Sequence, residues 1–575
     1  MGRAFVPHII TPDSALGGKD IRRSLRFNPS DRTYLEKTFS SAGNRRTFTF
    51  SFWIKRTTTG RNTFIFSPQV GGDGSNESRL YITSDDQLRL YDSGGSSGYI
   101  VARAAALLRD VSSWYHCVVA IDTTQSTDSN RGKFYINGVQ QEIDTSGFHQ
   151  WGNQNQQLGW SNNNRHRIGS DGYQNSFSDS MIITDYLAEV HYINGLQLDA
   201  SYFGFTDPQT GIWMPKRYEG TYGTNGFYLD FSDNSSTAAL GIDKSPNGND
   251  FTANNFSVSA GEGNDSVEDT PTNNYPTLNP LDMGSTTASH LVYSNGNLQV
   301  KAASGVWAST RATFHVSSGK WYWEVKLVSA SELRPFIGII QSDVRLASNQ
   351  TEQSNELGAT STGLAYWGLS YIRGGNNTSG TNTNVPTITT GDIVGVALDM
   401  DNKKVFFSKN GTFFASQDPA NSTGEIVAFS TTMQSATIAP VIQTYNNTSE
   451  AAMNFGQRPF DYTPPTGFKK LNSKSLTVTS PSIVNSQKHF KCLTYTGDDS
   501  DDRDITGLEF KPDFVWIKNR GQLDWHILQD SVRGANKIWY ANRSEGEVTD
   551  NTNGHVNYFN KDGFNLTAGA SGNVN

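Results

Sequence analysis

Apolar and polar residues alternate in short runs along most of the chain from about residue 23. In "TFTFSFWIK" (47–55), every second residue from Phe48 to Ile54 is large and apolar, which places these side chains on one face of a strand. Clusters of Gly, Asn, Asp and Ser separate such runs, as turns separate the strands of a sandwich or barrel. The pattern predicts an all-β chain built from antiparallel sheets.

Further strands are predicted in the first part of the chain, at 79–83, 87–92, 114–122, 132–140 and 187–195. Within "YINGV", Asn137-Gly138 supplies the positive φ angles that a two-residue hairpin turn requires. We expect these strands to form one domain over residues 23–210.

The stretch "SSGKWYWEVKL" (317–327) places three aromatic residues in a row, from Trp321 to Trp323. In a strand, Trp321 and Trp323 share one face, and Tyr322 and Glu324 share the other. We expect the two Trp side chains in a sandwich core and Glu324 in water. Ligand contacts are then expected from loops.

Composition supports this fold and narrows the function classes. The 575 residues include 54 Gly, 12% aromatic and only 18% charged residues, and a chain of this length is expected to hold three or four domains. The net charge of -8 provides no basic field for nucleic acid or an anionic membrane surface. No window approaches about 18 apolar residues, and no signal peptide is recognised, so we expect neither membrane insertion nor export by that route. Cys117 and Cys492 provide no disulfide framework, which fits a chain made in a reducing cytosol.

Four motifs occur in a recognisable order in the first domain: "FTFSFWIKR", "RDVSSWYHCVVAIDTT", "FYINGVQ" and "LAEVHYINGLQLDASYFG". Together they resemble the laminin G-like, concanavalin A-like jelly-roll domains of phage structural proteins. The resemblance covers about 170 residues and implies a β-sandwich.

Residues 211–289 are rich in Asn, Gly and Pro and contain few strand-length runs. Apolar residues such as Phe227, Phe231 and Phe251 make a free linker a poor interpretation, so we expect an irregular connector module that folds against a neighbour. Its phrases "GTNGFYLDF", "SPNGNDF" and "TPTNNY" resemble a module that recurs after such domains in phage tail-fibre proteins.

Residues 290–472 begin a second set of strands. "RATFHVSSGKWYWEVKL", the Gly391-Asp392 turn, Asp399 and "KNG" (409–411) are placed as in SPRY domains, which implies a second β-sandwich. Residues 473–575 resemble the opening of a further β-module at the C-terminal side of phage fibre proteins. We expect this partial module to continue beyond residue 575.

Catalytic patterns are weak. Glycan hydrolysis needs two facing carboxylates, and the laminarinase-type pattern Glu-x-Asp-x-x-Glu fails because Gly147 stands where Glu142 and Asp144 would require the second Glu. The sequence has no Gly-x-Ser-x-Gly and no His-Glu-x-x-His, and His116 is expected in a core or between strands. We therefore expect a protein that is not an enzyme.

No cofactor is required, and calcium is the metal ion for which oxygen-rich loops offer weak candidates. "DKSPNGND" places Asp243, Ser245 and Asn247 at alternate positions, but position 12 is Asn254 rather than Glu. "DDSDDRD" gathers acidic residues, of which the candidates are Asp498, Asp499 and Asp501. Solvated loops are the alternative for both.

Ligand contacts are expected where aromatic faces lie beside amides on loops. "FHQWGNQNQQLGWSNNNRHR" (148–167) is the richest such stretch, and "YWGLSYIRGGNNTSGTNTN" (366–384) is a second. The candidate residues are Trp151, Asn153, Gln154, Gln156, Trp160, Asn163, Arg165, Tyr371 and Arg373. The alternative is that Trp151 and Trp160 only anchor a long loop.

The resemblances imply a bacteriophage virion protein, a tail fibre or related appendage in host attachment, which binds a host surface glycan or protein through its sandwich loops. An N-terminal arm, residues 1–22 with Pro7 and Pro12, is expected to dock on other virion proteins of the tail or capsid. By analogy with fibres we expect a homo-oligomer, a homotrimer, which would multiply weak contacts. A purely structural capsid-decorating or tail-assembly protein is the main alternative, and a glycan depolymerase is another.

Overall fold

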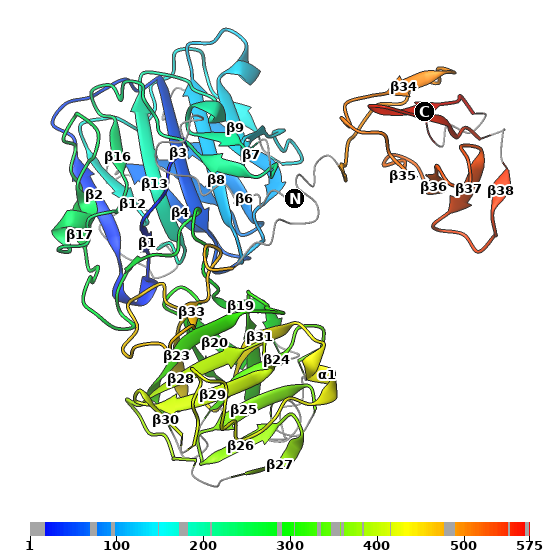
Figure 1. Ribbon diagram of the computed structural model, residues 1–575. Helices are drawn as coiled ribbons and strands as arrows, with labels where there is room; N and C mark the ends of the chain where they lie inside the picture. Colours follow the sequence, from blue (N-terminus) through cyan, green and yellow to red (C-terminus); the bar gives the residue numbers. More distant parts are fainter. Residues whose placement is uncertain are drawn as a thin grey trace, which may run out of the picture. The chain divides into compact units, whose positions relative to one another are not determined.

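The computed structural model describes residues 18–68, 77–93, 98–147, 149–171, 182–207, 210–283, 290–303, 305–330, 335–346, 357, 361–381, 385–414, 416–476, 489–549, 553–569 and 574. The chain divides into two compact units, one of residues 9–205 with 214–477, the other of residues 1–8 and 206–213 with 478–575. Figure 1 labels their elements.

The first sandwich consists of two antiparallel sheets. The strand order of one sheet is β10 (Val139–Gln140), β9 (Gly132–Ile136), β8 (Trp114–Asp122), β3 (Thr47–Lys55), β13 (Tyr186–Asn194), β1 (Ser24–Arg26) and β18 (Ser266–Val267), with β16 (Phe227–Leu229) also on β13. The order of the other is β11 (Gln150–Trp151), β7 (Ile100–Leu107), β6 (Gln87–Asp92), β5 (Ser78–Ile82), β4 (Thr63–Pro68), β12 (Arg165–Ile168), β2 (Tyr34–Thr38) and β17 (Thr252–Asn254). Short elements are η1 (Pro29–Asp31), η3 (Asp128–Asn130), η5 (Ala200–Tyr202), η6 (Ala238–Gly241) and the pair β14 (Gly204–Thr206) and β15 (Trp213–Pro215).

The core of this sandwich follows the alternation in the sequence. The alternating apolar residues Phe48, Phe50, Phe52 and Ile54 all lie in the core between the sheets. Asn137 and Gly138 have φ angles of 48° and 82°, and they join β9 to β10 as the predicted hairpin. The prediction of a sandwich is confirmed.

The connector does more than fold against its neighbour, because it contributes strands to both sheets of the first sandwich. β16 pairs with β13, β18 pairs with β1, and β17 pairs with β2. Phe227, Phe251 and Phe256 lie in the core of that sandwich. Residues 227–267 are therefore structurally part of the jelly roll.

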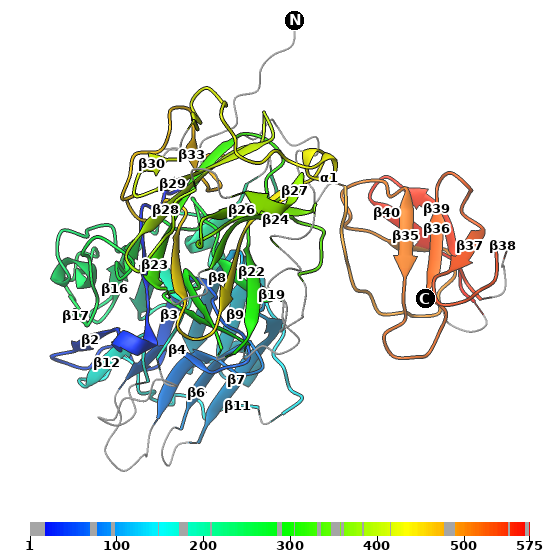
Figure 2. The same cartoon turned by 90° about the horizontal axis from the view of Figure 1, so that it is seen from below.

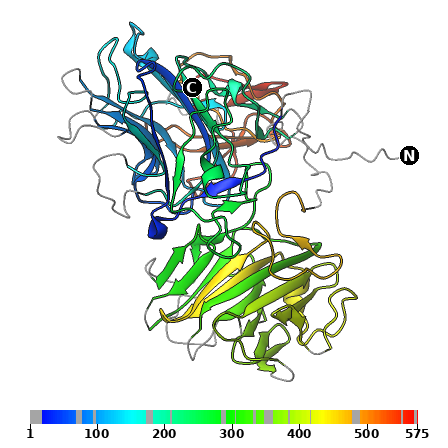
Figure 3. The same ribbon diagram turned by 90° about the vertical axis from the view of Figure 1, so that its left-hand side faces the viewer.

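The second sandwich also has two sheets, coloured green to yellow in Figure 3. The order of one is β19 (Leu278–Met283), β22 (Trp307–Ala312), β31 (Ile438–Tyr445), β24 (Phe336–Gln341), β25 (Gly363–Trp367), β26 (Tyr371–Gly374) and β27 (Asn377–Thr381). The order of the other is β20 (Leu291–Ser294), β21 (Gln299–Ala302), β32 (Glu450–Asn454), β23 (Lys320–Ser329), β28 (Ile393–Asp399), β29 (Lys404–Lys409) and β30 (Thr412–Phe413), with β33 (Lys469–Lys470) parallel to β23. α1 (Thr431–Gln434) is the one α-helix among the residues described.

Strand β23 buries both of its faces. Trp321 and Trp323 lie in the main core of the second sandwich, as predicted. The prediction that Glu324 faces water is wrong, because this side chain is 2% exposed. Its carboxylate accepts the backbone N–H groups of Asp461 and Tyr462, both at 2.9 Å, since the chain after β32 folds over this face.

Buried ion pairs join the connector to the first sandwich, in the part of the connector that precedes the second sandwich. Lys55 Nζ lies 2.7 Å from Asp269 Oδ2 and also donates to the carbonyl oxygen of Tyr275. Arg26 pairs with Asp265, and neither side chain is more than 1% exposed. Asn297 of the second sandwich donates to the carbonyl oxygen of Thr57 in the first, at 2.6 Å. Hydrogen bonds and ion pairs thus fix the connector between the sandwiches.

The C-terminal module has two small sheets, drawn in orange to red in Figure 2. Buried apolar residues from both sheets form one core. One has the order β34 (Arg503–Ile505), β40 (Gly563–Leu566) and β39 (Val556–Asn560). The other has the order β35 (Phe514–Ile517), β36 (Ile527–Asp530), β37 (Lys537–Tyr540) and β38 (Val548–Thr549). Among the residues described, no helix has the length and apolar character needed to cross a membrane.

Candidate functional site

The two Trp residues of the predicted contact loop point into the jelly-roll core. Trp151 is 4% exposed and Trp160 is 1% exposed. Trp151 packs against Phe134 and directly over Gly132, where a Cβ atom would lie only 2.0 Å from the indole. Trp160 packs against Phe48. These indole rings anchor the loop, and neither presents a face to a ligand.

The rest of this loop is held by hydrogen bonds to its own chain. Gln156 is buried and donates to the carbonyl oxygen of Gly98, whereas the exposed Gln154 donates to the carbonyl oxygen of Thr124. Arg165 is half-buried beside Glu36, at 3.5 Å. Asn153 and Asn163 are exposed. The structure therefore leaves a polar surface at Asn153, Gln154 and Asn163, without the aromatic platform that the sequence predicted.

Tyr371 and Arg373 lie at one end of a row of aromatic rings on the outer face of a SPRY sheet. Cross-strand pairing places Trp307 opposite Tyr445, Phe336 opposite Trp367, and Trp367 opposite Tyr371. The ring centroids of Phe336 and Trp367 are 5.1 Å apart and nearly parallel, and those of Trp367 and Tyr371 are 5.8 Å apart. We call these five residues, Tyr445, Trp307, Phe336, Trp367 and Tyr371, the SPRY aromatic row.

Exposure along the SPRY aromatic row increases from its buried middle toward both ends, at Tyr445 and at β26. Trp307 and Phe336 are buried, while Trp367 and Tyr371 are half-buried. The guanidinium of Arg373 lies over the Trp367 ring, 5.8 Å from its centroid, where the negative ring face attracts it. This end offers flat apolar rings beside a cation, a combination that can hold a sugar or a peptide side chain.

The sequence prediction included Tyr371 and Arg373 of this surface but not Trp367, Phe336, Trp307 or Tyr445. The side chains of the row come from five strands, β22, β24, β25, β26 and β31, and Trp307 and Tyr445 are 138 residues apart along the chain. A single sequence shows the alternation within each strand but not the pairing between strands. Trp367 is the one of these residues that the sequence could have indicated, because it lies with Tyr371 in the candidate stretch 366–384.

The metal candidates in the connector already serve as hydrogen-bond acceptors. The carboxylate of Asp243 accepts the backbone N–H groups of Tyr228, Ser245 and Asn249 and also the hydroxyl of Ser245. Asn247 donates to the carbonyl oxygens of Gly223 and Gly226. Burial raises the pKa of Asp243. The oxygen atoms of Asp243 therefore accept hydrogen bonds from N–H and O–H groups, whereas calcium binding would need them and further oxygen atoms as ligands.

The acidic stretch of the C-terminal module lies on the surface. Asp498 is 3.2 Å from Arg503, and Asp501 accepts the backbone N–H of Ala568. Asp499 is exposed and has a φ of 58°. Across the described parts of the chain, no group of three His, Cys, Asp or Glu side chains is arranged to hold a metal ion.

A buried polar cluster lies on the outer side of β3, β8 and β13 in the jelly roll. The hydroxyl of Ser51 is 2.9 Å from Nε2 of His116, the pairing a nucleophilic serine would need. Burial lowers the pKa of His116 to about 3. Phe203, Pro215 and Lys216 close the cluster and leave no room for a water molecule. This pair is therefore a core hydrogen bond, as the sequence suggested for His116.

Glu189 is the acidic member of the same cluster and sits in a bulge of β13. Its φ of 50° and the shift in register between Ala188 and His191 mark the bulge, which turns its carboxylate inward. That carboxylate accepts a hydrogen bond from Tyr228 and lies 2.6 Å from Nζ of Lys19. Burial raises the pKa of Glu189 to about 7.

Lys19 also bears on the predicted N-terminal arm. Its backbone N–H donates to the carbonyl oxygen of Pro215, and Ile21 is buried with its N–H bonded to Thr272. Residues 18–22 are therefore part of the folded unit rather than of an arm, because the backbone N–H groups of Lys19 and Ile21 and the side chain of Lys19 have partners there. Residues 1–17 lie outside the described residues.

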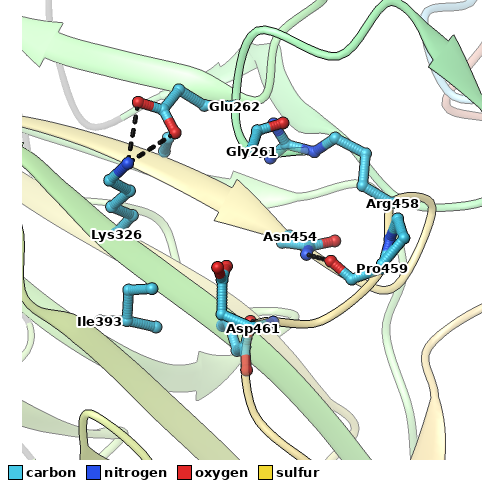
Figure 4. A pocket seen from close by; sticks show the side chains of 10 residues that line it. Gly261, Glu262, Lys326, Ile393, Asn454, Arg458, Pro459 and Asp461 are labelled. Atoms are coloured by element: carbon cyan, nitrogen blue, oxygen red, sulfur yellow. Dashed lines mark hydrogen bonds and ion pairs between the residues drawn. The ribbon is translucent and has the colours of Figure 1, made fainter. Parts of the chain in front are cut away.

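A small charged pocket lies between the connector and strands β23 and β32 (Figure 4). Lys326 donates to both carboxylate oxygens of Glu262, and the guanidinium of Arg458 donates to the carbonyl oxygen of Gly261. Burial lowers the pKa of Arg458 to about 10. The enclosed space is ≈ 20 Å³, about that of one water molecule, so this pocket holds the connector in place and is too small for a sugar.

The carboxylates considered for glycan hydrolysis do not form a facing pair with a second acid. Asp144 pairs with Arg103 at 3.1 Å and accepts hydrogen bonds from Ser146 and Gln87. The hydrogen bond from Ser146 holds the pKa of Asp144 below its usual range. Glu142 is exposed. A carboxyl with a depressed pKa is a poor general acid.

Three family models match parts of this chain. Residues 30–182 match a family described as the concanavalin A-like lectin/glucanases superfamily. Residues 320–458 match the SPRY domain. Residues 485–575 match a domain of unknown function, DUF7483. The jelly roll is thus laminin G-like and the second sandwich is SPRY-like, as the sequence motifs predicted.

Solved structures with similar parts include three of different kinds. The SPRY domain of human HERC1 is 16% identical, with 31% of this chain and 96% of that chain covered and a TM-score of 0.24. A heptameric SAP-like pentraxin from Limulus polyphemus is 16% identical, with 32% and 80% covered and a TM-score of 0.23. A putative carbohydrate binding protein from Bacteroides ovatus is 17% identical, with 41% and 58% covered and a TM-score of 0.26. The assignment of the two sandwiches rests on the family matches, which suggest carbohydrate- or protein-binding domains.

Proposed function

We propose that this chain is a bacteriophage virion protein, a tail fibre or related surface appendage, that attaches the particle to its host by binding a glycan or a protein without catalysing a reaction. The observation that carries the proposal is the tandem of a laminin G-like and a SPRY-like sandwich in one compact unit. The motif order that resembles phage fibre proteins supports the virion location.

The proposed contacts lie on exposed or half-exposed parts of rigid scaffolds. In the jelly roll they are the amides of Asn153, Gln154 and Asn163. In the SPRY sandwich they are Tyr371 and Arg373 at the end of the SPRY aromatic row. Each contact is small, so binding to a cell surface would depend on several copies of the chain in one particle, as in a homotrimeric fibre. Residues 1–17 are the segment proposed to contact other virion proteins.

The test uses the purified, fluorescently labelled full chain and cells of the bacterium on which the phage grows. We expect the chain to bind the cells and to slow adsorption of the phage, and we expect the double variant Tyr371→Ala with Arg373→Ala to bind several-fold more weakly. Tyr202→Ala serves as the control, because Tyr202 is an exposed aromatic residue in η5 that belongs to neither proposed set of contacts.

Two other results would contradict this function. A chain that binds purified particles but not cells or their polysaccharides has the structural role of a capsid-decorating or tail-assembly protein. New reducing ends in host polysaccharide incubated with the chain would show a glycan depolymerase.

A further inference from the structure

The C-terminal module carries large aromatic side chains on the face of a sheet that points away from its core. In β35, Val515 and Ile517 face the core between the two sheets, whereas Phe514 and Trp516 are 55% and 63% exposed. In β37, Ile538 and Tyr540 face the core and Trp539 is 39% exposed. The water-facing side of an antiparallel sheet is normally polar, so exposed aromatic residues on two of its strands indicate a contact surface.

Strand register gathers these residues into one line. Trp516 lies opposite Leu528 on β36, and Leu528 lies opposite Trp539 on β37. Residues directly opposite one another share a face, so the line Trp516, Leu528, Trp539 runs across three strands. We call it the C-terminal aromatic line. Two strand spacings separate the indoles by roughly 10 Å, close to the length of two sugar units in an extended chain.

Polar groups border the C-terminal aromatic line. Asp530 lies opposite Phe514 and so shares the aromatic face. Nε of Arg533 donates to Asp530 at 2.7 Å, and the guanidinium lies over the Trp539 ring, 3.3 Å from its centroid. A carboxylate and a guanidinium thus lie beside flat apolar rings, where hydroxyl groups of a ligand could accept and donate hydrogen bonds.

Size and charge decide which partner fits. The exposed parts of Phe514, Trp516 and Trp539 amount to roughly 300–400 Å² of aromatic surface, about half of the roughly 800 Å² per partner that a stable protein interface buries. Residues 485–575 contain 10 Lys or Arg and 13 Asp or Glu, a net charge of -3, which disfavours a phosphate backbone. A neutral polysaccharide needs neither a large interface nor a basic surface.

The chemistry of a sugar ring matches the line. One face of a pyranose presents C–H groups that pack on the negative face of an aromatic ring, while its hydroxyl groups point outward toward polar neighbours. We propose that the C-terminal aromatic line binds an extended neutral polysaccharide, with one sugar unit over Trp516, another against the exposed part of Trp539, and hydroxyl contacts to Asp530 and Arg533. This binding goes beyond the proposed attachment function, which places its contacts on the two sandwiches.

The experiment measures retardation of the full chain in native gels that contain barley β-glucan, glucomannan, xylan or dextran. We expect at least one of these polysaccharides to retard the wild type. We expect Trp516→Ala and Trp539→Ala each to weaken that binding about 10-fold, the effect of removing an aromatic anchor. Leu523→Ala and Tyr558→Ala are the matched controls, since both side chains are exposed in the same module but lie off the line.

Folding of each variant is checked by thermal unfolding, where an exposed Trp should contribute little. The variant Tyr371→Ala with Arg373→Ala should be retarded like the wild type, so failure of this inference is distinguishable from failure of the proposed function. Two results overturn the inference: no polysaccharide of the four retards the wild type, or the Trp variants and the controls are retarded alike. If Trp516→Ala instead lowers the molar mass measured by light scattering, the line is a contact between copies of the chain and the inference is also wrong.

Discussion

The two sandwiches and the C-terminal module place their aromatic residues in opposite ways. In the jelly roll and the SPRY sandwich, Trp160 and Trp323 fill closed cores, and Trp307 and Phe336 of the SPRY aromatic row are also buried. In the C-terminal module, Trp516 lies outside a small core built from residues such as Ile527 and Ile538. The same residue type therefore stabilises one part of the chain and remains available for contacts in another.

The contact between the connector and the first sandwich shows a further contrast, because charged side chains are buried there as well as aromatic rings. Lys55 and Asp269 are both at most 1% exposed, and Asp269 also accepts from Trp114. In the C-terminal module, the side chains of the pair Lys491 and Glu509 are 30% and 70% exposed. Buried charge pairs are costly to break, whereas exposed ones contribute little.

Asp269→Ala should have the largest effect on stability. It leaves the Lys55 ammonium buried without its partner, so we expect the free energy of unfolding of the large unit to fall by about 3–5 kcal/mol. Urea unfolding of the full chain measures this loss of unfolding free energy. Asp20→Ala is the control, because it removes a half-exposed partner of Lys474 and should cost less than about 1 kcal/mol. An equal loss of unfolding free energy in the two variants would mean that the buried pair of Lys55 and Asp269 contributes no more stability than an exposed pair.

One substitution made at two sites tests the contrast between aromatic residues. Trp323→Ala should destabilise the large unit by about 3–5 kcal/mol, because it leaves a cavity in the core. Trp516→Ala should change stability by no more than about 0.5 kcal/mol. Differential scanning calorimetry of both variants provides the measurement. A large loss for Trp516→Ala would show that its ring is packed rather than exposed.

Glu189 should make stability depend on pH in a smaller way. Its pKa in the folded chain is raised to about 7 from 4.5 by burial, so the folded state binds the extra proton more tightly. The stability from this proton is fully present below about pH 4.5 and is lost as the pH rises through 7. Between pH 5 and pH 8, the melting temperature of the wild type should therefore fall by a few degrees relative to Glu189→Gln.

Comparing the two proteins at each pH removes the effect of other groups. The pKa values of His116 and His166 are lowered by burial, and their stability contributions run in the opposite direction in both proteins. Glu142→Gln is the control, because Glu142 is exposed. A constant difference in melting temperature from pH 5 to pH 8 would contradict the prediction.

Strand pattern and motif order predicted the fold well, because alternation identifies which side chains share a face. Alternation does not show how many faces are covered. Glu324 reads as a water-facing position, but a segment more than 130 residues later folds over it and supplies two backbone N–H groups. The loop at Trp151 and Trp160 was predicted as a ligand contact from its composition. Composition cannot distinguish a Trp that is buried in the core from a Trp that is exposed to a ligand. The C-terminal aromatic line depends on pairing between strands, which no single strand encodes.

The three connector strands have a practical consequence for how this protein can be cut or recombined. A fragment that stops near residue 210 would leave the edges of both jelly-roll sheets without the partners they have in β17 and β18, and would lose Phe227, Phe251 and Phe256 from the interior. Such a fragment should aggregate through its open edges. Exchange between related genes would preserve this domain only if the crossover fell after residue 267.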